Sequence, residues 1–560
     1  MQPVISADEM RRIDRLTVEK YGLPSLLLME AAANACLRVI AKRFEGDLSG
    51  KKVLILCGPG NNGGDGAALA RALSAAGVLN DVILFGRVSA THGDARSNFE
   101  VIRKLASFEA GSSSVPSPVS FVECENIQTW EEIARPRRTY DIVVDALFGT
   151  GLTRPLQGIY LQVIQHLAML RQARSRARES KPLIFSIDIP SGLNADLAEP
   201  IGETVQADLT VTFTAPKPAN VLPPASFFCG ELTVAHIGSP NTLLDSVGPK
   251  LFLAEQRDAR EWLVATRYKP NSYKNTHGHV LVIAGSRDFS GAAALCGNAA
   301  ARAGAGLVTI ATPTSAQAFV AARAMPEVMT SALCETDRGV VSDEAVDYVS
   351  LLAGKSTVLA IGPGLTADDE RTRRFVRQVI EKRTTPIVID ADGLNCLAPW
   401  PIELKGTNNH PLIITPHPGE MARLLGTANK AALADRVSVA REFATKNNVI
   451  VVLKGSRTLI AAADGHVIIN PTGNAGIGTA GAGDTLTGVI SGFLAQAFAN
   501  ARTTADAFST TCAAVYLSSL AGDIAARKLG MRSMVASDIR ERLAEAMCLL
   551  DPEGEMPRSN

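Results

Sequence analysis

The chain has 560 residues, which at roughly 100 to 200 residues per domain is enough for two large domains or several small ones. Its 56 Lys and Arg balance 56 Asp and Glu, so net charge gives no reason to expect binding to a nucleic-acid backbone or an anionic membrane. Only 5% of the residues are aromatic and 46 are glycine, a composition with few stacking platforms that is typical of α/β enzymes acting on small molecules.

The sequence has no pattern that predicts export or membrane insertion. It begins MQPVISADEMRRID, without a basic segment before an apolar one, and no uncharged apolar run reaches the roughly 18 residues of a membrane span. The 9 cysteines are scattered without a CxxC pair or zinc-like spacing, so we interpret them as buried apolar side chains. We expect a cytoplasmic protein with small-molecule partners, no nucleic acid and no membrane.

Short apolar runs recur along the chain, and each is followed by a polar or Gly-rich loop and an Ala-rich helical stretch. Continuous apolar runs predict strands that are covered on both faces, and therefore parallel sheets between two layers of helices. We predict an α/β protein with two doubly wound, three-layer αβα domains. The predicted strands lie at 53–57, 141–148, 183–189 and 209–215 in the first half, and at 279–285, 358–364, 386–392, 411–416 and 448–454 in the second.

The predicted domain boundary lies near residues 238–258. The segment GSPNTLLDSVGPK there contains Gly, Pro, Asn and Ser and no convincing long element. This boundary predicts one domain at 1–240 and a second at 255–550. Two further segments predict surface structure, namely GSSSVPSPVS (111–120) as an exposed loop and RQARSRARES (171–180) as a basic turn.

A Gly-rich loop, CGPGNNGGDG, follows the first predicted strand and precedes a helix. Glycines allow close backbone approach and the free N–H groups of a helix start attract anions, so the loop predicts a phosphate or pyrophosphate site. Gly58 to Gly63 also fit GxGxxG, but the next strand ends in Gly86 and Arg87, where a dinucleotide fold needs an acid for the ribose. We therefore reject an ordinary dehydrogenase.

Two carboxylates stand at the ends of later strands of the first half. Asp145 closes DIVVD and Asp188 closes FSID, and each is followed by a Gly-containing loop. Because the carboxyl ends of parallel strands share one edge of the sheet, these two residues and the NNGGD loop should meet in one cleft. The alternative is that both are helix caps or turn acids.

The motifs NNGGDG, VDALFGTGLTRP and DIPSGLNAD, with YGLPSLLLMEAA upstream, resemble the N-terminal epimerase domain of the NAD(P)H-hydrate repair enzymes over residues 5–235. The sequence departs from that family at Ala33, where Gly is usual. The resemblance implies that Asp188 is the catalytic acid/base and that Asn62, Asp145 and Ser191 help to ligate potassium, a hard cation that takes oxygen ligands. It assigns binding of the hydrated dinucleotide to Asn61, Asn62, Gly63, Gly64, Asp65, Gly149, Thr150, Gly151, Leu152, Thr153, Arg154, Pro155 and Asp188.

Near the C-terminus, GTAGAGDTLTG combines a Gly-rich turn, Asp484 and the start of a helix. Backbone N–H groups in such a turn can hold a phosphoryl group, and the carboxylate behind them can take a proton from an attacking hydroxyl. This GAGD element resembles the ribokinase superfamily; the alternative is a helix cap. Other strand ends supply His417, Glu420 and Lys454, of which His417 could be structural and Lys454 a solvated loop residue.

The motifs GHVLVIAGS, GAGLVTIATP, IGPGL, VIDADGLN, TPHPGE, LKG and GTAGAGD resemble the ribokinase-like, ADP- or ATP-dependent NAD(P)H-hydrate dehydratase domain over 265–545. Tyr273-Lys274-Asn275 departs from the His-Lys-Gly that the family often has. The resemblance implies a catalytic role for Asp484 and a nucleotide donor, with Mg²⁺. It assigns hydrate binding to Ala292, Gly364, His417 and Asp484, and nucleotide binding to Lys454, Gly455, Ser456, Arg457, Thr458 and Gly483.

Both halves thus predict repair of NADH or NADPH hydrated at C6 of the nicotinamide ring: a Rossmann-like domain that interconverts the R and S hydrates, and a ribokinase-like domain that dehydrates the S form. The resemblance to bacterial fused members favours ADP over ATP, and we expect a homo-oligomer. Two alternatives stay open at this point. One is a small-molecule kinase with a ligand-binding first domain, and the other is a non-catalytic dinucleotide sensor.

Overall fold

The structure is a computed structural model that describes residues 1–108, 118–134, 139–176, 182–499 and 506–555. The chain divides into two compact units, Pro3–Pro249 and Lys250–Asn560, the latter including Met1–Gln2. The predicted loop at 111–120 and the predicted turn at 171–180 lie partly outside the described residues. Their described parts differ from prediction, because residues 171–176 continue a helix and residues 119–120 begin a strand.

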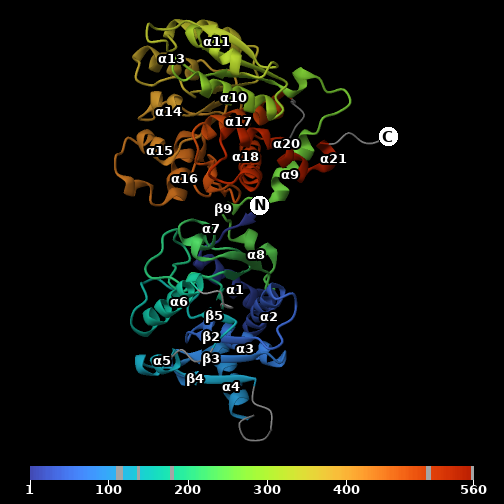
Figure 1. Ribbon diagram of the computed structural model, residues 1–560, viewed down its shortest axis with the longest axis vertical. Coiled ribbons are helices and arrows are strands. Elements are labelled where there is room, and N and C mark those ends of the chain that lie inside the picture. The colour runs from blue at the N-terminus through green and yellow to red at the C-terminus, as the bar shows by residue number, and fades with distance from the viewer. Residues whose placement is uncertain (109–117, 135–138, 177–181, 500–505, 556–560) are drawn as a thin grey trace. The chain divides into compact units, whose positions relative to one another are not determined.

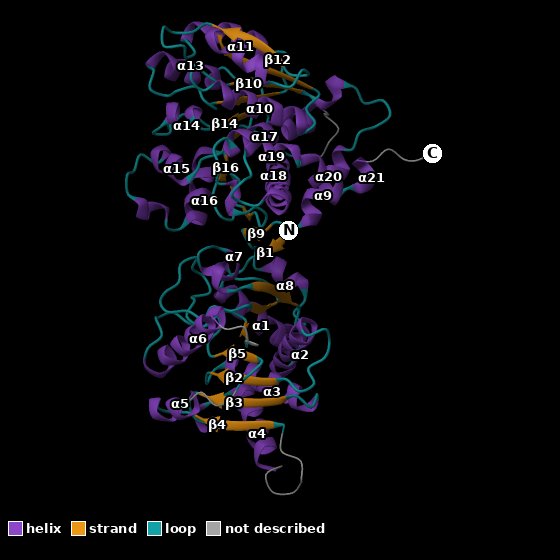
Figure 2. Cartoon of the chain, viewed as in Figure 1, coloured by secondary structure: helices purple, strands orange, loops and turns teal. Residues whose placement is uncertain are grey.

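The N-terminal unit is built on a parallel sheet, which confirms the predicted Rossmann-like class (Figures 1 and 2). Its described strands have the order β4-β3-β2-β5-β6-β7-β8, and all neighbouring pairs are parallel. The strands are β2 (Lys52–Cys57), β3 (Leu79–Leu84), β4 (Val119–Glu123), β5 (Ile142–Ala146), β6 (Leu183–Ile187), β7 (Leu209–Phe213) and β8 (Glu231–Ala235).

Alternate residues of β2 pack into two different cores, which is why this strand is apolar without a break. Val53 and Ile55 pack with α2, α3 and α4 on one face, whereas Leu54 and Leu56 pack with α5 and α6 on the other. The sheet is therefore the middle layer of three. The helical segments are α1 (Ala7–Tyr21), α2 (Ser25–Arg43), α3 (Asn61–Ala75), η1 (Val88–Ala90), α4 (Gly93–Phe108), α5 (Ile127–Ala134), α6 (Gly158–Arg176), α7 (Pro218–Val221), η2 (Ala225–Phe228) and α8 (Asn241–Ser246).

The strand order of this sheet reverses between β2 and β5. The chain runs outward from β2 through β3 to β4, returns to β5 beside β2, and then continues through β6 to β8. Loops that follow the two strands at such a reversal diverge and leave a crevice at the carboxyl edge. The predicted NNGGD loop is the start of α3, directly after the short loop that follows β2, and β5 carries Asp145, so the topology brings these motifs to one place.

The C-terminal unit is built on a larger sheet that is mixed rather than purely parallel. Antiparallel β17 lies between β16 and β18, so the prediction of parallel sheets was wrong for this segment. Two short β-hairpins join these strands in place of helical crossovers. The strands are β1 (Gln2–Pro3), β9 (Leu251–Leu253), β10 (His279–Ile283), β11 (Leu307–Pro313), β12 (Met329–Leu333), β13 (Val358–Ile361), β14 (Ile387–Ile389), β15 (Leu412–Ile414), β16 (Ile450–Leu453), β17 (Leu459–Ala461) and β18 (Val467–Ile469), in the order β1-β9-β18-β17-β16-β15-β14-β13-β10-β11-β12.

This sheet also reverses its strand order, here between β10 and β13. The entry segment at Tyr273 to Asn275 leads into a short 3-10 turn before β10. The helical segments are α9 (Gln256–Thr266), η3 (Lys274–His277), α10 (Ser290–Arg302), α11 (Thr314–Arg323), η4 (Asp343–Ala345), α12 (Val346–Ala353), α13 (Glu370–Glu381), α14 (Asp392–Leu397), α15 (Pro418–Leu424), η5 (Lys430–Leu433), α16 (Arg436–Asn447), η6 (Ala475–Ile477), α17 (Ala482–Ala499), α18 (Ala507–Leu529), α19 (Ala536–Glu541), α20 (Leu543–Leu550) and α21 (Pro552–Glu555).

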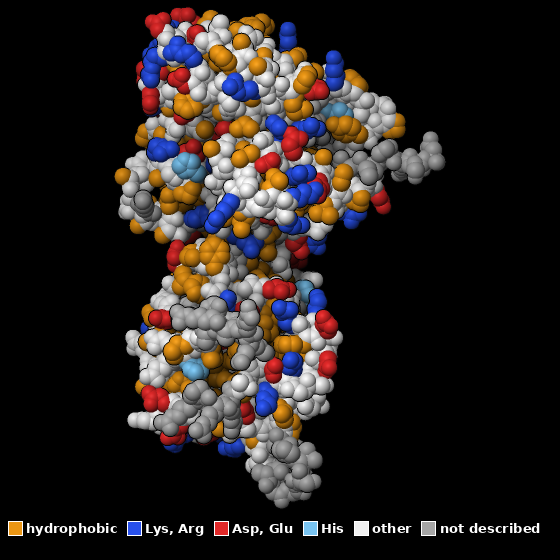
Figure 3. All heavy atoms as spheres, viewed as in Figure 1, with side chains coloured by type: hydrophobic (Ala, Val, Ile, Leu, Met, Phe, Trp, Pro, Cys, Tyr) orange, Lys and Arg blue, Asp and Glu red, His pale blue; other side chains and the backbone are white. Residues whose placement is uncertain are grey.

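The surface is charged and mixed. Lys and Arg side chains are interspersed with Asp and Glu on the face shown in Figure 3, as the balanced composition predicts. Within the described residues, no helix is both long and apolar enough to cross a membrane.

Helices α10 and α17 of the C-terminal unit pack unusually closely at Gly488. A Cβ atom at this position would lie 2.1 Å from the carbonyl oxygen of Cys296 and 2.8 Å from Cβ of Ala299. Because both contacts involve rigid atoms of α10, only a glycine fits without moving a helix. This contact sets how α17, which begins with Asp484 in its first turn, sits against the sheet.

We expect Gly488→Ala to destabilise the C-terminal unit by about 1–3 kcal/mol through overpacking. The matched control is Gly291→Ala on α10, where an added Cβ meets nothing within 4 Å and should be neutral or slightly stabilising. Thermal or urea unfolding of both variants measures the difference. Equal unfolding midpoints would contradict the close packing.

Candidate active sites

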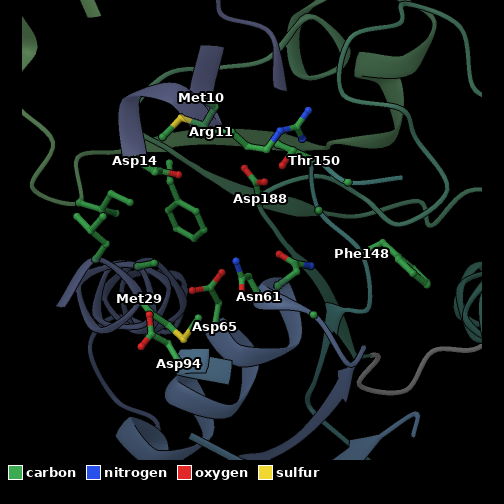
Figure 4. A pocket seen from close by; sticks show the side chains of 18 of the residues that line it. Met10, Arg11, Asp14, Met29, Asn61, Asp65, Asp94, Phe148, Thr150 and Asp188 are labelled. Carbon is green, nitrogen blue, oxygen red and sulfur yellow. The ribbon is translucent and has the colours of Figure 1, made fainter. Parts of the chain in front are cut away.

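A cavity of about 590 Å³ opens at the crevice of the N-terminal unit (Figure 4). Its walls come from α1 and α2, from the start of α3, and from the segments that follow β5, β6 and β7. The lining includes both apolar side chains, such as Met29 and Phe148, and the carboxyl groups of Asp14, Asp65 and Asp188. This is the mixture of apolar walls and a few convergent polar groups that small-molecule sites use.

The structure brings only part of the predicted N-terminal set to this cavity. Asn61, Asn62, Asp65, Asp188 and the segment 149–151 line it. The later part of the 149–155 loop does not: Leu152 is buried in the core, and Thr153 to Pro155 are exposed away from the lining. Gly63 is a packing residue, because a Cβ there would lie 1.8 Å from the carbonyl oxygen of Gly58.

Gly64 likewise contributes shape rather than a binding group. It is buried, and a Cβ there would lie 2.8 Å from atoms of Ala95 and Met29. The absence of a side chain lets α3 approach α2 and α4. Ala33, where the sequence departs from the family, is fully buried in this same core.

Asp188 is held in place by a buried lysine. Its Oδ1 accepts hydrogen bonds from Nζ of Lys217 at 2.7 Å and from the hydroxyl of Thr212 at 2.9 Å. The side chain of Lys217 is only 1% exposed, so the two charges neutralise each other away from water. Asp188 also has φ of +65°, a left-handed conformation that is uncommon for a residue with a side chain and that aims the carboxyl group at the cavity.

Asp145 lies behind the cavity wall in a network of oxygen atoms. Its carboxylate accepts from the hydroxyl of Ser191 at 2.6 Å, from the backbone N–H of Ser191 at 2.8 Å and from the hydroxyl of Ser186 at 2.9 Å. Burial raises the pKa of Asp145, and these hydrogen bonds oppose the rise. The backbone of Phe148, which lines the cavity, also donates to the Ser191 hydroxyl at 3.0 Å.

Two further carboxyl groups share the cavity with the Asp188–Lys217 pair. Burial raises the pKa of Asp14 to about 6, with Lys217 acting in the opposite direction and Asp188 adding to the rise. Burial, then repulsion from Asp188 and Asp14, raises the pKa of Asp65 well above its usual value. Since Lys217 is already paired with Asp188, these two groups are the ones that hold protons most readily.

Sequence reasoning missed Asp14 and Lys217. Lys217 stands just after β7 in FTAPKP, so the strand-end logic that found Asp145 and Asp188 was available for it as well. Asp14 lies within α1 among other charged residues, and nothing in its sequence context separates it from a solvated helix face.

The C-terminal unit has a second lysine–carboxylate pair at its carboxyl edge, in which Asp390 is buried and Lys454 is partly buried. Nζ of Lys454, after β16, donates to Oδ1 of Asp390, after β14, at 2.7 Å. Hydroxyls of Thr415 and Thr487 donate to the same carboxylate at 2.7 and 3.0 Å. Burial acts to raise the pKa of Asp390, but Lys454 and the hydroxyls outweigh it, so the net direction is down. Glu420 adds a second carboxylate 3.8 Å from Lys454 Nζ.

Asp484 lies next to this pair in the first turn of α17. Gly483, the residue before Asp484, lies against this pair: a Cβ atom there would lie 3.2 Å from Lys454 Nζ and 3.4 Å from Asp390 Oδ2. Burial, followed by repulsion from Asp390, raises the pKa of Asp484 to about 7, while Lys454 acts to lower it. A carboxylate that binds a proton near neutral pH is suited to general base catalysis.

The other predicted hydrate-binding residues lie around the reversal of this sheet. Gly364 has φ of +66°, and a Cβ there would lie 3.1 Å from Cβ of Ala292, so these two adjoin. His417 caps α15: its Nδ1 accepts from the backbone N–H of Gly419 at 2.9 Å, and its side chain is 51% exposed. It therefore has a structural function in addition to any contact with a ligand.

Arg436, which sequence reasoning missed, packs against the segment 454–458 and hydrogen-bonds to its backbone. Its guanidinium donates to the carbonyl of Ser456 at 2.9 Å and lies 2.9 Å from where a Cβ of Gly455 would be. The guanidinium of Arg457 donates to the carbonyl of Pro471 at 3.0 Å. This hydrogen bond links the segment 454–458 to the residues that follow β18. Asp390, also missed, stands in the quoted motif VIDADGLN directly after a buried strand, where its signal was available.

These features define an α/β enzyme with two separate catalytic units, each with a carboxylate–lysine pair at the carboxyl edge of a sheet, beside an acid that has no ion-pair partner among the described residues. Comparison with known proteins shows which one. Residues 280–545 match the family described as NAD(P)H-hydrate dehydratase, and residues 25–219 match the YjeF-related protein N-terminus.

Full-length relatives share both units. The bifunctional NAD(P)H-hydrate repair enzyme of Moorella thermoacetica is 38% identical over 99% of this chain and 98% of its own length. Those of Thermofilum pendens and Escherichia coli are 35% and 31% identical, covering 99% and 98% of this chain and 97% and 94% of their own. The crystal structure of the ADP/ATP-dependent NAD(P)H-hydrate dehydratase of Bacillus subtilis, co-crystallised with ATP and Mg²⁺, is 27% identical and covers 54% of this chain and 99% of its own, with a TM-score of 0.44.

The chain therefore belongs to the family of bifunctional NAD(P)H-hydrate repair enzymes. It is an enzyme of NAD(P)H-hydrate repair with an epimerase and a dehydratase activity. This outcome confirms the predicted function, and it supports neither a small-molecule kinase nor a non-catalytic sensor.

The buried Asp188–Lys217 pair gives a prediction about stability. Lys217→Met should destabilise the N-terminal unit by about 3–5 kcal/mol, because it leaves a buried carboxylate without its cation. Adding Asp188→Asn to that variant should recover part of the loss, since the unpaired charge is then removed as well. Calorimetry measures both, with the transition of the C-terminal unit as an internal reference.

The matched control for this prediction is Lys51→Met. Lys51 pairs with Asp141 at 3.3 Å, but both side chains are partly exposed, so its loss should cost less than about 1 kcal/mol. Equal losses in the Lys51 and Lys217 variants would show that burial adds nothing to the Asp188 pair.

Proposed function

We propose that residues 1–240 interconvert the R and S hydrates of NADH and NADPH at C6, and that residues 255–550 dehydrate the S hydrate with ADP or ATP as phosphoryl donor. The observation that carries the proposal is the pair of separate sites, each with a perturbed acid beside a fixed carboxylate–lysine pair. One such acid is Asp65, the last residue of NNGGD, which lines the cavity, and the other is Asp484, the last residue of GAGD, in the first turn of α17.

In the dehydratase, Asp484 takes the proton of the C6 hydroxyl while that oxygen attacks the terminal phosphoryl group of the nucleotide. Hydroxide is a poor leaving group, and phosphate is a good one, so phosphorylation prepares the C6–O bond for elimination. The backbone N–H groups of the turn at 481–483 stabilise the charge that develops on the phosphoryl oxygens. Ala292, Gly364 and His417 would contact the hydrate, and the segment 454–458 with Gly483 the nucleotide.

Mg²⁺ would enter this site with the nucleotide. Among the described residues, no group of three or more His, Cys, Asp or Glu side chains is arranged to hold a metal ion by itself. Mg²⁺ commonly keeps several waters and is bound through substrate phosphates and one or two carboxylates, and Glu420 is available for that here. Bound Mg²⁺ supplies neutralisation of phosphate charge.

The epimerase site has the donor atoms that potassium needs. Asp145, Ser191 and the carbonyl oxygen of Phe148 are clustered within hydrogen-bonding distances, and every donor atom is an oxygen. Nδ2 of Asn62 is buried and has no hydrogen-bond partner among the described residues, so this amide is free to reorient towards a ligand. Asn62, Asp145 and Ser191 would hold the ion, which when bound supplies a fixed positive charge beside the dinucleotide.

Localisation in the cytoplasm and assembly into a homo-oligomer belong to the same proposal. Leu26 and Leu27, at the start of α2, are 43% and 51% exposed and provide an apolar surface that a second copy of the chain could cover. ADP is favoured over ATP by the fused arrangement of the two units.

The role of Asp484 predicts a pH dependence. Dehydration of the S hydrate should rise with pH as Asp484 ionises near pH 7, because only the deprotonated carboxylate accepts the hydroxyl proton. Asp484→Asn should lower the rate by about 10² to 10⁴ and remove this dependence, with nucleotide binding retained. NADH absorbance follows the reaction.

The control for Asp484→Asn is Asp347→Asn, a chemically identical change at a side chain that is 96% exposed. It should leave the rate and the pH profile unchanged. A folded Asp484→Asn protein that dehydrates the S hydrate at a normal rate would overturn the role of Asp484 as general base.

The potassium proposal predicts a selective loss. Asp145→Ala should raise the potassium concentration needed for half-maximal epimerisation and slow the reaction, while dehydration of pure S hydrate by the same chain stays intact. Both activities are measured on one preparation, so the dehydratase serves as the internal control. Equal losses in the two activities would instead assign Asp145 to general stability.

A further inference from the structure

The epimerase cavity contains more carboxyl groups than its buried lysine can neutralise. Asp14 comes from α1, Asp65 from the first turns of α3, Asp94 from α4 and Asp188 from directly after β6, and all four line the same space (Figure 4). Lys217 donates its closest hydrogen bond to Asp188. Arg11 also lines the cavity, and its guanidinium forms an ion pair with Asp8, three residues earlier in α1.

Asp188 and Asp65 differ in their hydrogen-bond and ion-pair partners. Asp188 is fixed through Oδ1 by Lys217 and Thr212, which leaves Oδ2 facing the loop after β5, where a Cβ of Gly149 would lie 3.1 Å away. The carboxyl group of Asp65 makes no hydrogen bond and no ion pair with the described residues. One group is thus a paired carboxylate, and the other is a half-buried acid with no cation paired to it among the described residues, which favours the neutral form.

Inversion at C6 of the hydrate requires proton transfer on two faces of one ring. C6 carries both the hydroxyl group and ring nitrogen N1, so its C–O bond can break when the nitrogen lone pair forms a C6=N1 double bond. The leaving oxygen must gain a proton on one face, and the water that returns must lose a proton on the other. A carboxylate on one wall of the cavity cannot reach both faces.

We propose that Asp65 is a second catalytic acid/base, which works opposite Asp188 in an elimination and re-addition of water at C6. This proposal rests on the epimerase function proposed above. Figure 4 shows the two side chains entering the cavity from different elements, with space between them. Asn61 and Asn62, one turn before Asp65 on α3, provide amide groups on the same wall.

The step balances in atoms and charge. The C6–O bond breaks, its electron pair leaves with the oxygen, and the proton of Asp65 converts that oxygen to water. The nitrogen lone pair closes the C6=N1 bond. A water on the opposite face then attacks C6, the C=N electron pair returns to nitrogen, and the excess proton of the water goes to Asp188. One water leaves, one enters, and one proton moves from Asp65 to Asp188.

The reverse reaction uses the same two residues with their roles exchanged, so Asp188 gives the proton and Asp65 takes it. Either protonation state of the pair contains one proton, and solvent can reset it between turnovers. Lys217 balances the one negative charge that Asp65 and Asp188 together carry in either state.

The first test uses the unaltered full-length protein. Pure S or R hydrate is incubated in ¹⁸O-labelled water without nucleotide, and the inverted product is separated and weighed by mass spectrometry. Elimination and re-addition put one solvent oxygen at C6 in each inverted molecule, above the exchange measured without protein. Inversion with retention of the original oxygen would overturn the proposal while leaving the epimerase function standing; no inversion at all would instead overturn the epimerase function.

The second test uses variants of the same chain. Asp65→Asn should slow epimerisation by about 10² to 10⁴, as expected for loss of a positioned acid/base, and Asp65→Ala should be partly rescued by added formate. Asp245→Asn, an identical change at an exposed residue of the same unit, should keep the normal rate. Rescue by formate shows that the variant is folded and lacks only the carboxyl group.

Two outcomes would overturn the assignment of Asp65. One is epimerisation at a normal rate by Asp65→Asn. The other is a loss confined to Asp14→Asn, which would place the second acid on α1 rather than on α3. Loss in Asp65→Asn without any rescue of Asp65→Ala by formate would also count against a proton-transfer role, since a folded site with a vacant carboxyl position should accept the small acid.

Discussion

Both catalytic units depend on the same constraint, the placing of a carboxylate charge inside the carboxyl edge of a sheet. Each unit meets it with a lysine that donates at 2.7 Å and with threonine hydroxyls on the same carboxylate. Taking two charges out of water is expensive, so such a pair persists only where hydrogen bonds satisfy its remaining atoms. The pairs Asp188–Lys217 and Asp390–Lys454 then fix the charge around which each site is arranged.

Once each lysine is paired, other carboxyl groups at each site are left without an ion-pair partner among the described residues. Asp65 and Asp14 in the first unit and Asp484 in the second are half-buried near a carboxylate that is already paired, and desolvation with like-charge repulsion raises their pKa values. A single arrangement therefore yields both an ionised group and a group that exchanges protons near neutral pH. General acid–base chemistry needs both kinds.

Glycine shapes both sites as much as charge does. In the first unit Gly58 and Gly63 bring the loop after β2 against α3, and in the second Gly483 leaves room for Lys454 beside Asp390. Gly488 likewise allows close packing deeper in the core, where the absence of a side chain lets α17 approach α10. Many of the family's Gly-rich motifs are thus requirements of backbone packing, and only some of their residues face the ligand space, as the buried Gly64 and Leu152 illustrate.

The sequence by itself determined the αβα class, the nine strands marked by long apolar runs and the family, because buried parallel strands are apolar without a break and because the motifs at their ends are long. It also placed Asp145, Asp188 and Asp484 at strand or helix ends. It did not reveal antiparallel β17, whose three buried residues resemble any short buried strand. Nor did it reveal which acids are paired: Asp188 meets Lys217 from 29 residues away and Asp390 meets Lys454 from 64, and such partners are chosen by the spatial order of strands. Protonation follows from that pairing, so only the tertiary structure decided it.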